Sequence, residues 1–158
     1  MTPGETVLKH DCFQITQKVF IRDGNRLLVM RDRKSGYGDL PGGRMTEREF
    51  FSDWMHSVAR ELQEELGSLV QLDIRAQPIF IHRHRVNDEN FPCLIIAYEA
   101  NFKSGNLVIS EEHDYMEWVD IQEFKAEELF SEHMLDAVNY YLNKYCRAHG
   151  IEKNNFFG

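Results

Sequence analysis

Two segments of the chain have apolar residues at helical spacing. In the first segment these residues recur at intervals of three and four, on one face of a helix; they are Met55, Val58, Ala59, Leu62 and Leu66. Asp53 can cap the first turn and Gly67 can end the last, which predicts a helix over residues 53–66. A second amphipathic helix is predicted from a Ser131 cap through Tyr145, with apolar residues at the same spacing.

Strand-like segments lie on both sides of the first helix. Residues 13–22 and 26–30 are rich in apolar residues, and the Asp23-Gly24-Asn25 turn between them predicts a hairpin. Four more strands are predicted at residues 77–86, 93–102, 107–109 and 115–119. Because strands and helices do not alternate regularly, the order favours an α+β fold, with a mixed β-sheet in an α/β/α sandwich, over a doubly wound parallel sheet.

Composition and charge narrow the classes of partner. The chain has 158 residues, of which 42% are hydrophobic and 28% charged. These values predict one globular domain over residues 1–158, with loose termini at 1–11 and 151–158. With 18 Lys and Arg against 26 Asp and Glu, the net charge is −8, which is unsuited to broad nucleic-acid or anionic-membrane binding. An anionic substrate fits if a divalent cation helps to bind it.

The cysteines and the apolar runs predict a cytoplasmic protein. Cys12, Cys93 and Cys146 are odd in number, far apart and outside any C-x-x-C motif, so we expect free thiols in a reducing compartment. Residues 1–11 lack a signal-peptide pattern. Apolar runs such as Leu94–Ala97 are far shorter than the ~20 residues of a membrane-spanning helix.

Three glutamates share one edge of the first predicted helix. At about 100° per residue, Glu61, Glu64 and Glu65 fall within an arc of about 100° beside the apolar stripe. Carboxylates this close raise each other's pKa, and a bound Mg²⁺ or Mn²⁺ ion removes that penalty. The alternative is a solvated acidic helix face. The preceding Arg60, the upstream Gly-Gly turn and the adjoining buried face favour a metal site.

The residues around this cluster resemble the Nudix box, G-x5-E-x7-R-E-U-x-E-E-x-G-U, in which U is a bulky aliphatic residue. Gly43 and Glu49 match its first half, and the segment from Arg60 to Gly67 matches its second half without a gap. The preceding Leu40-Pro41-Gly42-Gly43 also resembles the usual lead-in of the family. The order of strands and helices is similar to that of the family along the whole chain.

Two positions depart from the Nudix pattern. Ten residues separate Glu49 from Arg60, where the box has seven. We interpret the difference as a three-residue insertion, about Phe50–Ser52, in the loop before the helix, because loops tolerate extra length. The insertion leaves open whether Glu49 or the nearby Glu47 takes the role of the first glutamate. Ser68 at the final aliphatic position affects packing more than chemistry.

The resemblance implies a β-sheet between helices and the hydrolysis of a nucleoside diphosphate linked to another group, X. In the family, water attacks a phosphorus atom of the pyrophosphate with the help of Mg²⁺ ions, which we expect Mn²⁺ to replace. The implied metal ligands are the Gly42 carbonyl and the carboxylates of Glu61, Glu64 and Glu65. Glu49 and Arg60 are expected to form an ion pair that holds the loop against the helix.

The general base has two candidate positions. Family members use either a glutamate of the helix, here Glu61 or Glu64, or a glutamate of a distal loop. The loop candidates are Glu111 and Glu112, in the sequence Ser110-Glu111-Glu112-His113. We favour Glu112, because family members often place a glutamate directly before a histidine in this loop. An acidic surface loop is the alternative interpretation.

Further residues are candidates for substrate contacts. Tyr37 precedes the Gly-Gly turn and either stacks on a base or packs on its own loop, and Arg44 follows the turn. Arg83 and Arg85 share one face of a predicted strand and form a local basic patch that could contact a substrate phosphate. An exposed, solvated strand end is the alternative for these two arginines.

Two residue pairs have open interpretations. His82 and His84 share the other face of the same strand at a zinc-like spacing, but the sequence indicates no third ligand. Phe50 and Phe51, in the proposed insertion, either anchor the loop to the core or form part of a dimer surface.

We therefore expect a cytoplasmic, Mg²⁺-dependent pyrophosphohydrolase that acts on a small-molecule nucleoside diphosphate derivative, as a monomer or a homodimer. The identity of X stays open, and a nucleic acid is expected only as a capped or triphosphate RNA end. One rival is a catalytically silent Nudix-like nucleotide-binding or regulatory module, which the intact box glutamates disfavour. A second rival is isomerisation of an allylic diphosphate, but neither Cys12 nor Cys93 lies in a motif for it.

Overall fold

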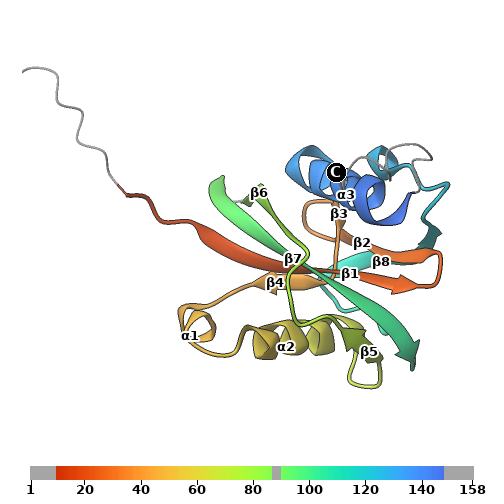
Figure 1. Ribbon diagram of the computed structural model, residues 1–158, viewed down its shortest axis with the longest axis horizontal. Helices are drawn as coiled ribbons and strands as arrows, with labels where there is room; N and C mark the ends of the chain where they lie inside the picture. Colours follow the sequence, from red (N-terminus) through yellow and green to blue (C-terminus); the bar gives the residue numbers. More distant parts are fainter. Residues whose placement is uncertain (1–9, 87–89, 148–158) are drawn as a thin grey trace, which may run out of the picture.

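The structure is a computed structural model that describes residues 10–86 and 90–147 (Figure 1). Within them, eight strands form one mixed sheet. The strands are β1 (Gln14–Asp23), β2 (Arg26–Asp32), β3 (Gly38–Asp39), β4 (Gly42–Arg44), β5 (Gln71–Ile74), β6 (Phe80–Val86), β7 (Phe91–Ser104) and β8 (His113–Asp120). The helices are α1 (Glu47–Phe50), α2 (Trp54–Leu66), the 3₁₀ turn η1 (Ala126–Glu128), α3 (Glu132–Tyr141) and the π-helical turn η2 (Leu142–Cys146).

The sheet combines antiparallel and parallel pairing. β1 runs antiparallel to β2 and β4 and parallel to β7. β7 pairs antiparallel with β5 and β6, and β2 pairs antiparallel with β8. The short β4 strand lies against the middle of β1, where Gly42 is opposite Lys18. This pairing sets the glycine turn beside a buried part of the sheet.

Helices α2 and α3 cover opposite faces of the sheet, each over its own apolar core (Figure 1). The core under α2 includes Val19, Ile21, Leu28, Met30, Val58, Leu62 and Leu66. The core under α3 includes Phe20, Leu27, Val29, Met134, Val138 and Tyr141. Neighbouring residues of β1 and β2 alternate between the cores, so the segments Val19–Ile21 of β1 and Leu27–Met30 of β2 are buried on both faces and have unbroken apolar sequences. This arrangement confirms the expected α+β fold with a mixed sheet in an α/β/α sandwich.

The longest predicted elements agree with the structure. The hairpin of β1 and β2 turns at Gly24, and α2 begins after Asp53, whose side chain accepts a hydrogen bond from the Met55 N–H at 2.9 Å. Gly67 follows α2, and its N–H donates to the Gln63 carbonyl. The second predicted helix ends its α-helical part at Tyr141, four residues early, and continues as the π-helical η2.

Other expectations need correction. Residues 107–109 are not a strand, because the Val108 N–H donates to the Leu66 carbonyl at 3.0 Å and so ties this segment to the end of α2. The strand predicted from residue 77 begins at Phe80. Ser131 holds the N-cap position of α3, but its side chain makes no capping hydrogen bond. The short elements α1, β3, β4, β5 and η1 were not predicted.

The remaining expectations concern the termini, the cysteines and the membrane. Most of the predicted loose termini, residues 1–9 and 151–158, lies outside the described residues, while residues 10 and 11 have no regular structure. All three cysteines are free, and Cys93 is buried. Among the described helices, none is both long and apolar enough to cross a bilayer.

Candidate functional site

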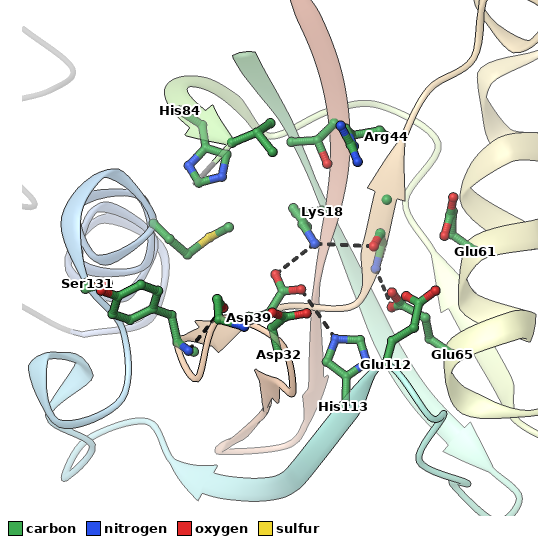
Figure 2. Close-up of a pocket in the computed structure, with 18 of the residues that line it drawn as sticks. Lys18, Asp32, Asp39, Arg44, Glu61, Glu65, His84, Glu112, His113 and Ser131 are labelled. Atoms are coloured by element: carbon green, nitrogen blue, oxygen red, sulfur yellow. Dashed lines mark hydrogen bonds and ion pairs between the residues drawn. The ribbon is translucent and has the colours of Figure 1, made fainter. Parts of the chain in front are cut away.

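A cleft of about 450 Å³ lies between the C-terminal half of α2 and the start of α3 (Figure 2). One wall is acidic and the other is mixed polar and apolar. The residues on the α2 side are Gly42, Gly43, Arg44, Glu61, Glu64, Glu65, Glu112 and His113. The residues on the α3 side and the floor include Thr16, Lys18, Asp32, Tyr37, Asp39, His84, Val86, Ser131 and Met134.

Only glycine fits at Gly42 in this wall, whereas a Cβ atom at Gly43 would displace the movable end of the Glu61 side chain. Gly42 has a φ of +129°, and a Cβ atom there would lie 1.9 Å from the Gln17 carbonyl oxygen. A Cβ atom on Gly43 would lie 2.4 Å from the Glu61 carboxyl carbon. Both glycines therefore let β4 lie directly between β1 and the carboxylates of α2.

Glu65 is the most buried of the helix glutamates, with 5% of its surface exposed. Its Oε2 atom accepts a hydrogen bond from the Gly42 N–H at 2.8 Å. Burial raises the pKa of Glu65 to about 7, although the nearby Lys18 ammonium and the Gly42 N–H favour the charged form. A carboxylate held this way is fixed in position and gains free energy from a cation placed beside it.

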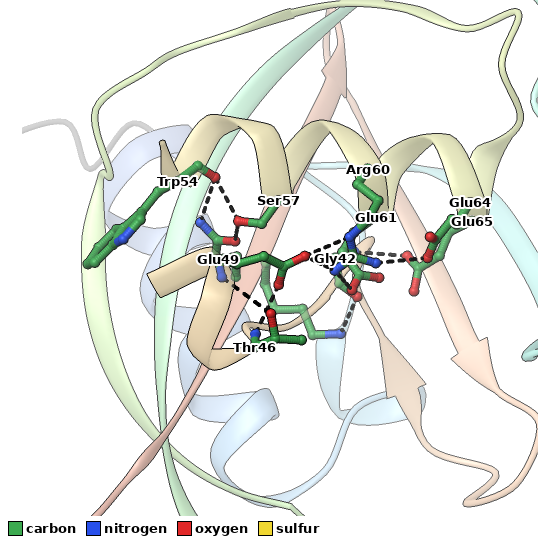
Figure 3. Close-up of polar contacts among 11 residues, drawn as sticks. Gly42, Thr46, Glu49, Trp54, Ser57, Arg60, Glu61, Glu64 and Glu65 are labelled. Carbon is green, nitrogen blue, oxygen red and sulfur yellow. Dashed lines mark hydrogen bonds and ion pairs between the residues drawn. The ribbon is translucent and has the colours of Figure 1, made fainter. Parts of the chain in front are cut away.

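Arg60 contacts Glu61 and Glu64 of α2 and Glu49 of α1 (Figure 3). Its guanidinium nitrogens lie 2.8 Å from Glu61, 3.0 Å from Glu64 and 2.6 Å from Glu49. Burial raises the pKa of Glu61, with a further contribution from the Glu64 charge, while Arg60 opposes the shift. The structure thus pairs Glu49 with Arg60 as the resemblance implied.

Of the three extra residues before α2, Phe50 ends the short helix α1, and Phe51 and Ser52 form the turn that follows it. Thr46 caps α1, and a reciprocal capping box forms between Thr46 and Glu49, with the Thr46 N–H donating to Glu49 Oε2 at 2.9 Å. Phe50 and Phe51 are 44% and 80% exposed and pack edge to face, so they do not anchor the loop in the core. Phe50 instead contacts Trp54, the first residue of α2.

The donor set suits a hard divalent cation, because every candidate ligand is an oxygen atom. The carboxylates of Glu61, Glu64 and Glu65 and the Gly42 carbonyl all border the cleft. As the side chains stand, no three His, Cys, Asp or Glu residues within residues 10–86 and 90–147 converge on a point that could hold a metal ion. Arg60 contacts one carboxylate oxygen of Glu61 and one of Glu64.

The distal loop reaches the same cleft. Glu112 lines it next to His113 and faces the α2 wall, whereas Glu111 is absent from the lining (Figure 2). The Arg33 N–H donates to the Glu112 carbonyl at 2.8 Å, and the Arg33 guanidinium donates to the His113 carbonyl at 3.3 Å. Of the two loop glutamates, the structure therefore brings Glu112 to the helix glutamates.

The candidate substrate residues separate into two groups. Tyr37 and Arg44 line the cleft. Arg83 and Arg85 do not, because alternation along β6 places them on the opposite face from His84, which lines the cleft. Arg85 instead donates to the Asn90 carbonyl at 2.9 Å.

The sequence analysis did not identify three titratable residues of the cleft, Lys18, Asp39 and His113, as part of the site. Lys18 lies 2.8 Å from Asp39, and the imidazole of His113 lies 3.4 Å from the other carboxylate oxygen of Asp39. Burial alone would raise the pKa of Asp39, but Lys18 and His113 lower it to about 2. The signal in the sequence is weak, because Lys18 directly precedes the apolar run Val19–Ile21, whereas only the fold brings Asp39 and His113 to the cleft.

Comparison with protein families gives one match, to the NUDIX domain, over residues 13–138. Among curated protein sequences, none matches the chain significantly. Many solved structures match the fold.

Three solved structures illustrate this match in fold. A MutT NUDIX hydrolase from Burkholderia pseudomallei is 18% identical, with a TM-score of 0.65, over 85% of this chain and 99% of its own. A MutT protein from Methanosarcina mazei Go1 is 20% identical, with a TM-score of 0.67, over 85% of this chain and 96% of its own. A C. elegans Ap4A hydrolase is 14% identical, with a TM-score of 0.65, over 82% of this chain and 95% of its own. At these identities the likeness shows a shared fold.

Proposed function

This chain belongs to the Nudix hydrolase family, and we propose that it is a Mg²⁺-dependent pyrophosphohydrolase of a nucleoside diphosphate linked to another group, X. Nudix hydrolases act on nucleoside diphosphate derivatives and use divalent metal ions. The observation that supports the proposal most is the buried Glu65, held by the Gly42 N–H beside Glu61 and Glu64 at the wall of the cleft. Such a wall suits a substrate whose negative charges are bridged by cations.

The proposed metal ligands are Glu61, Glu64, Glu65 and the Gly42 carbonyl. When bound, divalent cations neutralise the pyrophosphate, polarise its phosphorus atoms and lower the pKa of the attacking water. Arg60 contacts only one oxygen of Glu61 and one of Glu64, so the second oxygen of each carboxylate would be left for an ion. The ion pair of Arg60 with Glu49 would hold α1 against α2.

Residues outside the α2 wall have separate proposed roles. Glu112 reaches the cleft from the distal loop and is the favoured general base, with Glu61 and Glu64 as the helix alternatives. Tyr37 and Met134, on the α3 side, offer an aromatic ring and an apolar surface to the nucleoside. Arg44 adds a cation for the substrate phosphates.

The proposed substrate is a small molecule, and a nucleic acid fits only as a capped or triphosphate RNA end. The chain has a net charge of −8, so the proposed binding of phosphates depends on the cleft and its cations. Three free thiols agree with a reducing compartment such as the cytoplasm.

A substrate screen tests the proposal. Purified protein with Mg²⁺ is incubated with nucleoside triphosphates, dinucleoside polyphosphates, nucleotide sugars, ADP-ribose and capped RNA, and products are separated by HPLC. We expect cleavage of a diphosphate linkage in at least one class, and loss of that cleavage with Glu65→Gln. Tight nucleotide binding without turnover of any compound would identify a silent binding module instead.

A further inference from the structure

A continuous series of polar contacts crosses the floor of the cleft from the distal loop to helix α2 (Figure 2). It starts where Ser110 Oγ lies 3.3 Å from His113 Nδ1, and His113 Nε2 lies 3.4 Å from Asp39. Asp39 is paired with Lys18 at 2.8 Å, and Lys18 Nζ donates to the Gly42 carbonyl at 3.3 Å. The next contact is the Gly42 N–H to Glu65 described above.

Lys18 is the centre of this series. Its ammonium has three N–H donors, and they have three acceptors: Asp39 at 2.8 Å, the Leu40 carbonyl at 3.1 Å and the Gly42 carbonyl at 3.3 Å. Lys18 is 7% exposed and His113 is 2% exposed, so water contributes little to holding either side chain. The ammonium therefore fixes the whole turn from Asp39 to Gly42 against β1.

A buried ion pair of this kind needs an explanation other than stability. Removing two charges from water is energetically unfavourable, and apolar residues of similar volume often stabilise a fold as well or better. The position of the Lys18–Asp39 pair supplies an explanation. It lies between the two parts of the site that the chain brings together from far apart, the α2 glutamates and the loop that contains Glu112.

We propose that Lys18, Asp39 and His113 form a positioning relay that sets the Glu112 loop against the Gly42–Glu65 wall. Asp39 links the other two residues, since one of its carboxylate oxygens contacts Lys18 and the other contacts His113. The relay residues do not act on the substrate. They fix the backbone on each side of Glu112 and Gly42, so that the loop carboxylate and the α2 carboxylates face the same point.

This inference rests on the proposed role of Glu112, and a double-mutant cycle tests it. The variants are His113→Leu, which removes the contact to Asp39, and the isosteric Asp39→Asn, each made alone and together with Glu112→Gln. Asp114→Asn is the matched control, because Asp114 is adjacent to His113 but pairs with Arg31 at the surface.

We expect His113→Leu and Asp39→Asn each to lower kcat on the order of 10- to 100-fold, because small misplacements of a reacting group have effects of this size. KM should change little, and Asp114→Asn should match wild type. In the Glu112→Gln background, His113→Leu should lower kcat less than about twofold further, since the relay acts through Glu112. His113→Gln, whose amide can still donate to Asp39, should recover part of the loss.

Three outcomes would overturn the relay. The first is an equal loss of kcat from His113→Leu in the wild-type protein and in the Glu112→Gln variant, which would indicate general destabilisation. The second is wild-type kcat in folded Asp39→Asn, a variant that keeps the site testable if His113→Leu does not fold. The third is wild-type kcat in Glu112→Gln, which removes the role of Glu112 as well. Metal-dependent hydrolysis by the wild-type protein would still support the rest of the proposed function in each case.

Discussion

Arg60 and Glu49 form an ion pair across the junction between α1 and α2, with Arg60 Nη2 2.6 Å and Arg60 Nε 2.7 Å from Glu49 Oε1. The pair forms although three more residues lie between them than the Nudix pattern has. The extra residues, about Phe50–Ser52, form the end of α1 and the turn after it, and Glu49 still faces α2. The capping box with Thr46 orients the Glu49 carboxylate from the other side.

This pairing predicts a difference between two neighbouring glutamates. Glu49→Gln should lower kcat about tenfold, because a hydrogen bond between charged groups contributes on the order of 1.5 kcal/mol and holds Arg60 in place. Glu47→Gln, also in the first turn of α1, should behave like wild type. Steady-state kinetics of both variants measure the difference. A larger loss from Glu47→Gln would assign the role of the first glutamate to that residue.

The buried Glu65 predicts a severe effect on catalysis with an intact fold. Glu65→Gln keeps the size of the side chain and an acceptor for the Gly42 N–H, so circular dichroism and thermal unfolding should show a folded protein. Loss of the charge should lower kcat on the order of 10³-fold, the size of effect seen when one electrostatic contact of about 3–4 kcal/mol is removed. Near-native turnover would show that the metal face is placed wrongly.

The oxygen-only donor set predicts strict dependence on a divalent cation. Activity should disappear in excess chelator and return with Mg²⁺ or with Mn²⁺, because both ions favour carboxylate and carbonyl oxygens. Elemental analysis of the chelated protein is the control for residual metal. Full turnover by protein shown to be free of metal would contradict the assignment.

The distal loop predicts unequal roles for two adjacent glutamates. Glu112→Gln should lower kcat with little change in KM, the result expected when an interaction is made mainly in the transition state. Glu111→Gln should be nearly silent, since Glu111 does not line the cleft. Glu61→Gln distinguishes two alternatives. A far larger loss of kcat at Glu61 than at Glu112 would favour a general base on the helix. Comparable losses would indicate a metal and water network shared by Glu61 and Glu112.

The raised pKa of Glu65 predicts a pH effect on the stability of the metal-free protein. Its pKa is about 7 in the folded state against an ordinary value of 4.5, so the folded state binds this proton more tightly than the unfolded state. The contribution of Glu65 to stability therefore falls as pH rises from about 4.5 to about 7.

Glu65→Gln isolates this contribution. The free energy of unfolding of the variant, relative to wild type, should increase across the same pH range by up to about 3 kcal/mol and then level off. Denaturant titrations in chelator at several pH values measure it. A difference that does not change with pH would indicate that Glu65 titrates normally.

Local patterns in the sequence determined the elements that depend on neighbouring residues. Apolar spacing with Asp53 and Gly67 at its ends defined α2, and the turn at Gly24 defined the β1–β2 hairpin, because capping and turn formation involve residues close in the chain. The box motif, which includes Glu61, Glu64 and Glu65, likewise lies within one short stretch of sequence.

Tertiary structure alone decided which distant residues complete the cleft. Lys18 of β1, Asp39 of β3 and His113 of β8 come together because β1, β2 and β8 are adjacent in the sheet and β4 folds back on β1. No local pattern encodes these distances. For β6, alternation along the strand already places Arg83 and Arg85 opposite His84, and the fold decides that the His84 face borders the cleft. The sequence therefore specified the chemistry of the α2 wall, and the fold selected the residues that face it.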